Sequence, residues 1–138
     1  WGTCSKACLS KLLLLQKRAV RSIANVSYGE HTRPYFIKYS LLTAEQSLTQ
    51  KLAIYMFHKI KLHPEFVQEN YINKGSTYTF RHTHYLQSRI RTNYGSQKIL
   101  NQIAQLLNNH PEILSMINSS NTLHTFKSTI KSFLLRLM

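Results

Sequence analysis

The chain has 138 residues, in which 18 lysines and arginines face five glutamates and no aspartate, for a net charge of +13 with histidine neutral. This length suits one domain of ~100–200 residues, which we expect to cover residues 1–138. Five scattered glutamates argue against a two-metal phosphoryl-transfer centre, no apolar run reaches the ~20 residues of a membrane span, and two cysteines do not make a disulfide scaffold.

Residues 5–26 predict an amphipathic helix. At about 100° per residue, one arc of about 160° is apolar and holds Cys8, Leu9, Leu12, Leu13, Leu15, Ala19, Val20 and Ile23. The opposite arc is cationic and holds Lys6, Lys11, Lys17, Arg18 and Arg21, with Leu14 as an apolar exception. No acid on this helix pairs with those cations. We expect the apolar face to pack against the rest of the fold. We expect the cationic face to be either solvated or a binding surface for an anionic partner.

A break is predicted over residues 28–40, because Gly29 and Pro34 interrupt the helical pattern. This stretch is rich in aromatic side chains, namely Tyr28, Tyr35, Phe36 and Tyr39. The break separates the first helix from the helices that follow.

A central helix is predicted over residues 44–62. Thr43 and Gln46 have the spacing of a capping box at its start. Apolar side chains lie nearly all round this helix, which is typical of a helix at the middle of a fold. Pro64 ends it and suits the first turn of a short helix through about Glu69.

An irregular basic insert is predicted over about residues 70–95. It contains no acid, and its cations are Lys74, Arg81, Arg89 and Arg91, interleaved with Tyr71, Tyr78, Phe80, Tyr85 and Tyr94. The pattern shows no helical period over residues 75–94, which permits a short strand or an extended loop. Cations among aromatic rings suit single-stranded nucleic acid, since cations meet phosphates and rings stack on bases. The alternative is a loop whose tyrosines cover the edge of the core.

The last part of the chain predicts two further helices. Ser96 is the expected N-cap of the first, whose apolar residues are Ile99, Leu100, Ile103, Leu106 and Leu107. Pro111 ends it and opens a short turn through Met116. Asn121 or Thr122 caps the last helix, with an apolar stripe of Leu123, Phe126, Ile130, Phe133, Leu134 and Leu137. The expected class is mostly α: a small helical bundle with an irregular basic insert.

Catalytic and metal-binding patterns are scarce. Cys4 and Cys8 with His82 and His84 supply four zinc ligands on paper, but their spacing matches no recognised zinc motif. Two thiols without a metal are therefore the favoured interpretation. No acid is placed to orient a nucleophile, and no glycine-rich phosphate loop occurs. We expect no catalytic residue, metal site or cofactor in this chain.

The net charge of +13 is the strongest indication of function. On one small domain it favours an anionic polymer as partner, through counterion release. An anionic membrane surface is the rival, because the first helix is amphipathic. That helix lacks Trp and Phe on its apolar face, and the core needs the same face, so a membrane partner is disfavoured.

The order of motifs along the chain carries a family resemblance. The first block consists of Trp1-Gly2, residues 12–15, residues 16–21 with Ile23, His31-Thr32 and residues 34–36. Weaker blocks follow at residues 78–81, 89–93, 99–103 and 125–135. In this order they resemble the region after the polymerase core of LINE-type (non-LTR) retrotransposon reverse transcriptases. There a Trp-Gly and a leucine-rich run precede a Leu-Gln-Lys-Lys/Arg-Ala motif and a His-Thr-x-Pro-Leu-Phe motif.

The resemblance implies that the chain is the C-terminal fragment of a longer reverse transcriptase polyprotein. The family's catalytic aspartates lie upstream of the Trp-Gly, in a Tyr/Phe-x-Asp-Asp hairpin. The parent would then be an RNA-directed DNA polymerase, while this chain alone is not an enzyme. The missing upstream polymerase core would be a partner, and Mg²⁺ is expected only in that core. An intracellular location, in the nucleus and in cytoplasmic ribonucleoprotein particles, is also implied.

We accordingly predict that the chain binds RNA or DNA through the phosphate backbone. The first group of binding residues comes from the first helix: Lys11, Lys17, Arg18 and Arg21. The second comes from the insert: Arg81, Arg89 and Arg91, with Tyr78, Tyr85 or Tyr94 stacking on bases. The alternatives are a free-standing small basic protein of the ribonucleoprotein type and a non-functional retrotransposon relic. An open Tyr/Phe-x-Asp-Asp frame directly upstream in the genomic DNA favours the fragment.

Overall fold

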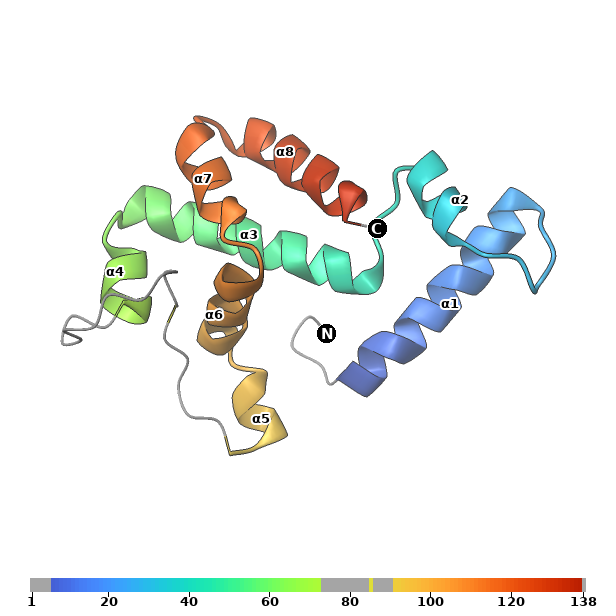
Figure 1. The fold of residues 1–138 in the computed structure, drawn as a ribbon, viewed down its shortest axis with the longest axis horizontal. Coiled ribbons are helices and arrows are strands. Elements are labelled where there is room, and N and C mark those ends of the chain that lie inside the picture. The colour runs from blue at the N-terminus through green and yellow to red at the C-terminus, as the bar shows by residue number, and fades with distance from the viewer. Residues whose placement is uncertain (1–5, 73–84, 86–90, 138) are drawn as a thin grey trace.

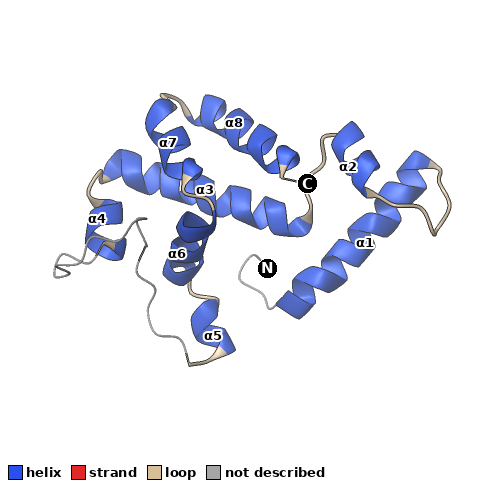
Figure 2. Ribbon diagram, in the orientation of Figure 1, coloured by secondary structure: helices blue, strands red, loops and turns tan. Residues whose placement is uncertain are grey.

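The computed structural model describes residues 6–72, 85 and 91–137, and its regular elements over those residues are all helices (Figures 1 and 2). In chain order they are α1 (Lys6–Ala24), α2 (Arg33–Lys38), α3 (Ala44–Leu62), α4 (Phe66–Tyr71), α5 (Asn93–Ser96), α6 (Ile99–Asn109), α7 (Glu112–Ser119) and α8 (Leu123–Arg136). The prediction of a mostly α fold is confirmed.

Helix α3 runs through the middle of the fold (Figure 1). It begins where the sequence predicts, because the Thr43 hydroxyl accepts a hydrogen bond from the Gln46 N–H and the Gln46 side chain accepts one from the Thr43 N–H. Helices α1, α4, α6 and α8 all contact it. These neighbours on several sides explain why its apolar residues lie nearly all round the helix.

Helix α8 packs along α3 and forms much of the core with it. Phe126, Ile130 and Leu134, four residues apart on one face, are at most 2% exposed. The Phe126 ring stacks on Phe57, with ring centroids 4.9 Å apart and an angle of 17° between the planes. Helices α6 and α7 add further buried residues to the same cluster, namely Ile103, Ala104, Leu106, Leu107, Ile113 and Ile117.

Residues 6–41, which contain α1 and α2, form an arm outside this core (Figure 1). None of them belongs to the main buried cluster of the described residues. Val20, Thr32 and Phe36 are the buried side chains of the arm, and α1 contacts both α2 and α3. The arm is therefore attached to the bundle through one edge of α1 and is open to solvent on its other sides.

Two helix starts differ from the sequence prediction. The predicted break after α1 contains the short helix α2, since Pro34 lies in its first turn, where a missing N–H breaks no helical hydrogen bond. The N-cap of α6 is Lys98 rather than Ser96. Ser96 instead ends α5, and the buried Asn101 side chain donates to the Gly95 carbonyl at 2.8 Å, which joins the two helices.

Helix α1 is rotated relative to the packing face that its sequence predicts. Part of the predicted apolar arc is covered, at Leu9, Leu13 and Val20. Leu15 and Ile23 belong to the same arc and are nevertheless 58% and 66% exposed. The fold instead covers part of the cationic side, where Lys17 and Arg21 are half-buried. The expectation that the whole apolar face packs is wrong, and a strip of it remains on the surface.

The predicted insert lies mostly outside the described residues. Helix α4 ends at Tyr71 and the short helix α5 begins at Asn93, so helical turns occupy the two ends of the predicted range. The alternative of a strand or an extended loop over residues 75–94 falls largely outside the described residues. Tyr85 is described and is buried, as set out below.

The Gln16 side chain fastens the arm to the start of α3. Its Nε2 donates to the Leu42 carbonyl at 3.1 Å, and its Oε1 accepts from the Ala44 N–H at 2.8 Å. The Ala44 amide opens α3 and has no carbonyl within its own helix to bond, so Gln16 caps the helix from a distant part of the chain. Gln46 makes a comparable link to α8, since its Nε2 donates to the Leu134 carbonyl at 2.7 Å.

Replacing Gln16 by alanine is expected to lower the free energy of unfolding by about 1–3 kcal/mol, because the buried Ala44 N–H loses its acceptor. Ala44 is 3% exposed, so water does not readily replace that acceptor. Urea denaturation followed by circular dichroism measures the change. Gln68 on α4 is exposed and provides the control, with Gln68→Ala expected within about 0.5 kcal/mol of the unsubstituted chain. Equal losses in both variants would contradict the assigned role.

Candidate nucleic-acid interface

Lys11 and Arg18 are exposed on the same side of α1. They are seven residues apart, which is about two helical turns and roughly 10 Å along the axis. Gln16 and Val20, which lie on the packed edge, point the other way round the helix. Two of the four cations predicted on this helix therefore present their charge to solvent side by side.

Lys17 and Arg21 are half-buried on the same helix. The Arg21 Nε donates to the Glu30 carbonyl at 3.0 Å, and its guanidinium lies 5.4 Å from the centre of the Tyr28 ring. Arg21 thus holds the loop after α1 in place, in addition to contributing positive charge. Substituting Arg21 would disturb this loop, so Lys11 and Arg18 are the better residues for testing the interface.

The arm carries two further cations that are not among the predicted binding residues. Arg33 and Lys38 are exposed on α2. Residues 6–38 contain seven lysines and arginines and one glutamate. Among the described residues, no lysine or arginine forms an ion pair with a glutamate. The scarcity of acids over this whole range is the signal that would have identified both residues.

The single glutamate of the arm has a neutral partner. The Glu30 carboxylate accepts a hydrogen bond from the Tyr35 hydroxyl at 2.7 Å. This hydrogen bond, together with burial, raises the pKa of Tyr35. The carboxylate thus contacts a phenol rather than a lysine or arginine side chain, and the positive charge of the arm is not neutralised by ion pairing within the described residues.

Exposed tyrosines lie beside the cations of the arm. Tyr28 is 76% exposed under the Arg21 guanidinium, and Tyr39 is 39% exposed with the Lys38 Nζ 5.6 Å from its ring centre. An accessible ring next to a cation is the combination that binds single strands, since the ring stacks on a base while the cation meets a phosphate. The aromatic content of this stretch is evident in the sequence, but neither tyrosine is among the residues predicted to stack on bases.

The residues predicted in the insert have different outcomes. Arg91 is exposed. Arg81, Arg89 and Tyr78 lie outside the described residues. Tyr94 belongs to α5, although its side chain is outside the description. Their predicted roles remain predictions.

Tyr85 does not fit its predicted stacking role. It is 7% exposed and belongs to the core cluster, and this burial raises its pKa. The Asn108 side chain also forms two hydrogen bonds with the Tyr85 backbone. The Tyr85 N–H donates to Asn108 Oδ1 at 2.8 Å, and Asn108 Nδ2 donates to the Tyr85 carbonyl at 3.0 Å. A base cannot stack on a ring that the core already covers, so Tyr85 is removed from the candidate set.

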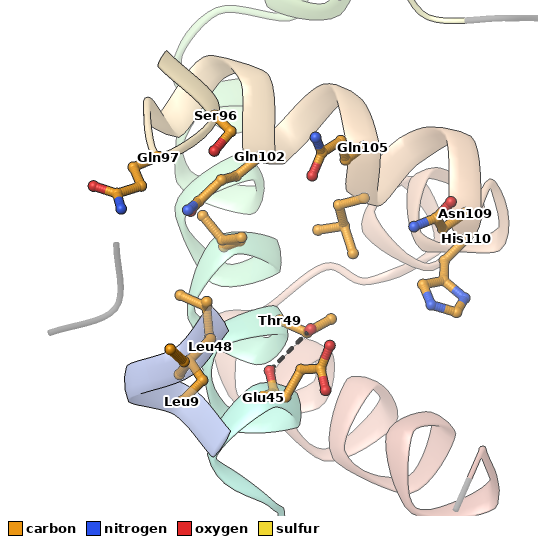
Figure 3. A pocket seen from close by; sticks show the side chains of 13 residues that line it. Leu9, Glu45, Leu48, Thr49, Ser96, Gln97, Gln102, Gln105, Asn109 and His110 are labelled. Carbon is orange, nitrogen blue, oxygen red and sulfur yellow. Dashed lines mark hydrogen bonds between the residues drawn. The ribbon is translucent and has the colours of Figure 1, made fainter. Parts of the chain in front are cut away.

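A groove of about 650 Å³ lies between α1, α3 and α6 (Figure 3). Its polar lining is rich in carboxamides, supplied by Gln97, Gln102, Gln105 and Asn109. Among the described residues that line it there is no lysine or arginine. Besides these carboxamides the described lining contains the carboxylate of Glu45, so the groove offers no lysine or arginine for a phosphate and is distinct from the cationic surface of the arm.

The described residues contain no group of three or more His, Cys, Asp or Glu side chains placed to hold a metal ion. Of the four zinc ligands considered from the sequence, Cys8 is exposed on α1. Cys4, His82 and His84 lie outside the described residues. Within the described part of the chain, no helix combines the length and apolar character needed to cross a membrane.

The fold and the surface together define a basic, all-helical domain, over the described residues, whose exposed cations and tyrosines gather on an arm. A scan of protein-family models, a search of curated proteins and a search of solved structures each find no match to the chain. The resemblance to LINE-type reverse transcriptases therefore depends on the sequence motifs alone.

Proposed function

We propose that the chain is the C-terminal nucleic-acid-binding part of a LINE-type reverse transcriptase, and that it holds template RNA or target DNA by the phosphate backbone. The observation that carries this function is the arm, where Lys11, Arg18, Arg33 and Lys38 are exposed without ion-pair partners among the described residues. Each phosphate contact releases counterions from the strand, so a few such cations give strong, salt-dependent binding.

The residues of the arm have separate roles in this function. Lys11 and Arg18 bind phosphates of the strand from one side of α1. Arg21 holds Tyr28 near the end of α1, with the guanidinium 5.4 Å from the ring centre, and Tyr28 stacks on an unpaired base. Lys17 adds charge at the packed edge of the helix. The predicted residues of the insert that remain in the candidate set, Arg81, Arg89, Arg91, Tyr78 and Tyr94, would extend the binding surface.

We assign no catalytic residue to this chain. RNA-directed DNA polymerisation would belong to the upstream core, whose aspartates hold Mg²⁺, in nuclear and cytoplasmic ribonucleoprotein particles. A free-standing basic protein of the ribonucleoprotein type would use the same arm. Translating the genomic DNA directly upstream separates the two, since the proposed fragment requires an in-frame Tyr/Phe-x-Asp-Asp and the free-standing protein does not.

Reversing both charges in Lys11→Glu/Arg18→Glu is expected to weaken binding to single-stranded RNA by at least about tenfold at about 0.1 M salt. The slope of log K against log salt concentration is expected to become shallower by about 1.4, because each phosphate contact on a single strand contributes about 0.7. Both side chains are exposed, so helicity is expected to persist. Fluorescence anisotropy of a labelled oligoribonucleotide at several salt concentrations measures both quantities.

The matched control is Lys127→Glu/Lys131→Glu. Both lysines are exposed on α8, and the substitution changes the net charge by the same amount. We expect this variant to keep its RNA affinity within about threefold, with the salt slope nearly unchanged. An equal loss in the two variants would show that only the net charge matters and would overturn the assignment of the site to the arm.

A further inference from the structure

An apolar stripe on the exposed side of α1 is left uncovered by the described residues. Leu15, Ala19 and Ile23 follow one another at four-residue spacing and line one side of the helix over about 12 Å. Leu15 is 58% exposed and Ile23 is 66% exposed. The half-buried Leu12 extends the same line by about one turn. These four residues are the α1 stripe.

Helix α8, like α1, is covered by the fold on one face only, so the exposed residues of the two helices can be compared. It buries Phe126, Ile130 and Leu134, while its exposed positions from His124 to Arg136 are all polar or charged. Helix α1 departs from this pattern, because leucine and isoleucine occupy exposed positions of the kind that α8 fills with serine, threonine and lysine. Contiguous exposed apolar side chains are typical of an interaction surface.

The charges beside the α1 stripe indicate the kind of partner. Lys11 and Arg18 lie next to it on the exposed face, between Leu14 on one side and Leu15 on the other. Helix α1 contains no acid that would offset them. We propose that the α1 stripe docks an amphipathic helix of a partner protein, whose apolar side chains cover the stripe and whose carboxylates face Lys11 and Arg18.

A second copy of the chain fits this surface poorly. In an antiparallel pair of α1 helices centred between Leu14 and Leu15, Lys11 of one copy would face Arg18 of the other. In a parallel pair each cation would face its own equivalent. Like charges placed across an interface oppose association, whereas the carboxylates of an acidic helix neutralise both cations.

A membrane surface fits poorly for a geometric reason. A helix that lies in the membrane interface has its apolar side chains in the middle of the inserted face and its cations at the margins, reaching outward. On α1 the order is reversed, because Lys11 and Arg18 occupy the middle of the exposed face, with Leu14 and Leu15 at its sides.

The partner helix and RNA would use the same two cations. Binding of one is therefore expected to exclude the other at this part of the arm. The two interactions differ in their need for the α1 stripe, since phosphate contacts require charge and not Leu15 or Ile23. Substitutions in the α1 stripe thus test the docked helix separately from the proposed nucleic-acid function.

The probe is a designed helical peptide with leucine at heptad positions a and d and glutamate at e and g, compared with the same peptide carrying lysine at e and g. The full chain is expected to bind the glutamate peptide and not the lysine peptide. Leu15→Ser/Ile23→Ser is expected to weaken that binding by at least about tenfold while leaving RNA affinity within about twofold. The control Leu62→Ser/Leu137→Ser removes leucines that are 72% and 52% exposed elsewhere and is expected to change neither.

A second variant keeps the test independent of the serine substitutions. Lys11→Gln/Arg18→Gln leaves the α1 stripe in place and is expected to weaken binding of the glutamate peptide by at least about tenfold. Circular dichroism checks that each variant keeps its helix content. If the full chain bound the peptide but not RNA, the proposed nucleic-acid function would be wrong and the docking surface would stand.

Three results would overturn the docking surface. The first is a glutamate peptide that binds Leu15→Ser/Ile23→Ser as tightly as the unsubstituted chain, because the attraction would then depend on net charge alone. The second is dimerisation of the full chain in sedimentation velocity that the serine variant loses. The third is retention on phosphatidylserine vesicles that the serine variant loses, since this would identify a lipid surface as the occupant.

Discussion

Replacing Phe126 by alanine is expected to lower the free energy of unfolding by about 3–5 kcal/mol. The side chain is 0% exposed, and its ring stacks on Phe57 at 4.9 Å between centroids. This contact joins α8 to α3, so its loss leaves a cavity between the two helices that form much of the core. Ile130 and Leu134 are already packed on the next turns of α8. Urea denaturation followed by circular dichroism measures the loss.

The control for Phe126→Ala is Leu137→Ala, after the end of the same helix. Leu137 is 52% exposed, so its truncation is expected to change the free energy of unfolding by less than about 1 kcal/mol. A loss of less than about 1 kcal/mol for Phe126→Ala as well would contradict the packing of α8 on α3.

Stability is expected to fall as the pH rises from about 10 to about 12, because of Tyr71. Burial, with a smaller effect from Tyr55, raises the pKa of Tyr71 from 10.0 to about 12. In the unfolded chain the phenol ionises near pH 10, so above that pH unfolding releases a proton and becomes more favourable. The free energy of unfolding therefore keeps its full value below about pH 10 and is about 1 kcal/mol lower near pH 11. Burial raises the pKa of Tyr85 in the same direction.

Tyr71→Phe separates this effect from the other effects of alkaline pH on the chain. The Tyr71 hydroxyl is buried without a hydrogen-bond partner among the described residues, so its removal is expected to leave stability at pH 7 unchanged or to raise it by up to about 1 kcal/mol. Between about pH 10 and 12 the variant is expected to lose less stability than the unsubstituted chain. Denaturant unfolding at several pH values measures this difference. Parallel pH profiles would show that Tyr71 does not titrate in the predicted way.

Local signals in the sequence predict the central helices well. The capping box at Thr43 gives the start of α3, and Thr122 caps α8 by accepting from the Thr125 N–H at 3.2 Å. Both signals depend on residues three apart, so no distant contact is needed to recognise them. The end of α7 is different, since the helix runs to Ser119, beyond the predicted end of the turn. Ile117, which is 0% exposed, packs in the core there.

The orientation of α1 could not be predicted from its periodicity. An apolar arc of about 160° shows that one side of the helix favours burial, but it does not show which part of that arc a neighbour covers. The position of α1 is set by contacts such as those of Gln16 with Leu42 and Ala44, which are 26 and 28 residues away. The α1 stripe remains exposed because these contacts hold the other edge of the helix against α3.

The candidate site was predicted in part, for similar reasons. Lys11 and Arg18 follow from helical periodicity, because they lie opposite the buried Val20. The burial of Tyr85 depends on Asn108, which is 23 residues away, and no local pattern distinguishes it from an exposed tyrosine such as Tyr28. Arg33 and Lys38 are not among the predicted binding residues because α2, which carries them, lies in a stretch that the sequence predicts as a break between helices.

The salt dependence of RNA binding is a direct test of whether the arm binds the phosphates of a single strand. The measurement is the slope of log K against log salt concentration for the full chain and a labelled oligoribonucleotide of mixed sequence, between about 50 and 200 mM salt. Contacts from Lys11, Arg18, Arg33 and Lys38 predict a slope of about −2.8 or steeper, with similar affinities for unrelated sequences. A slope near zero, or an affinity set by base sequence and insensitive to salt, would contradict the claim.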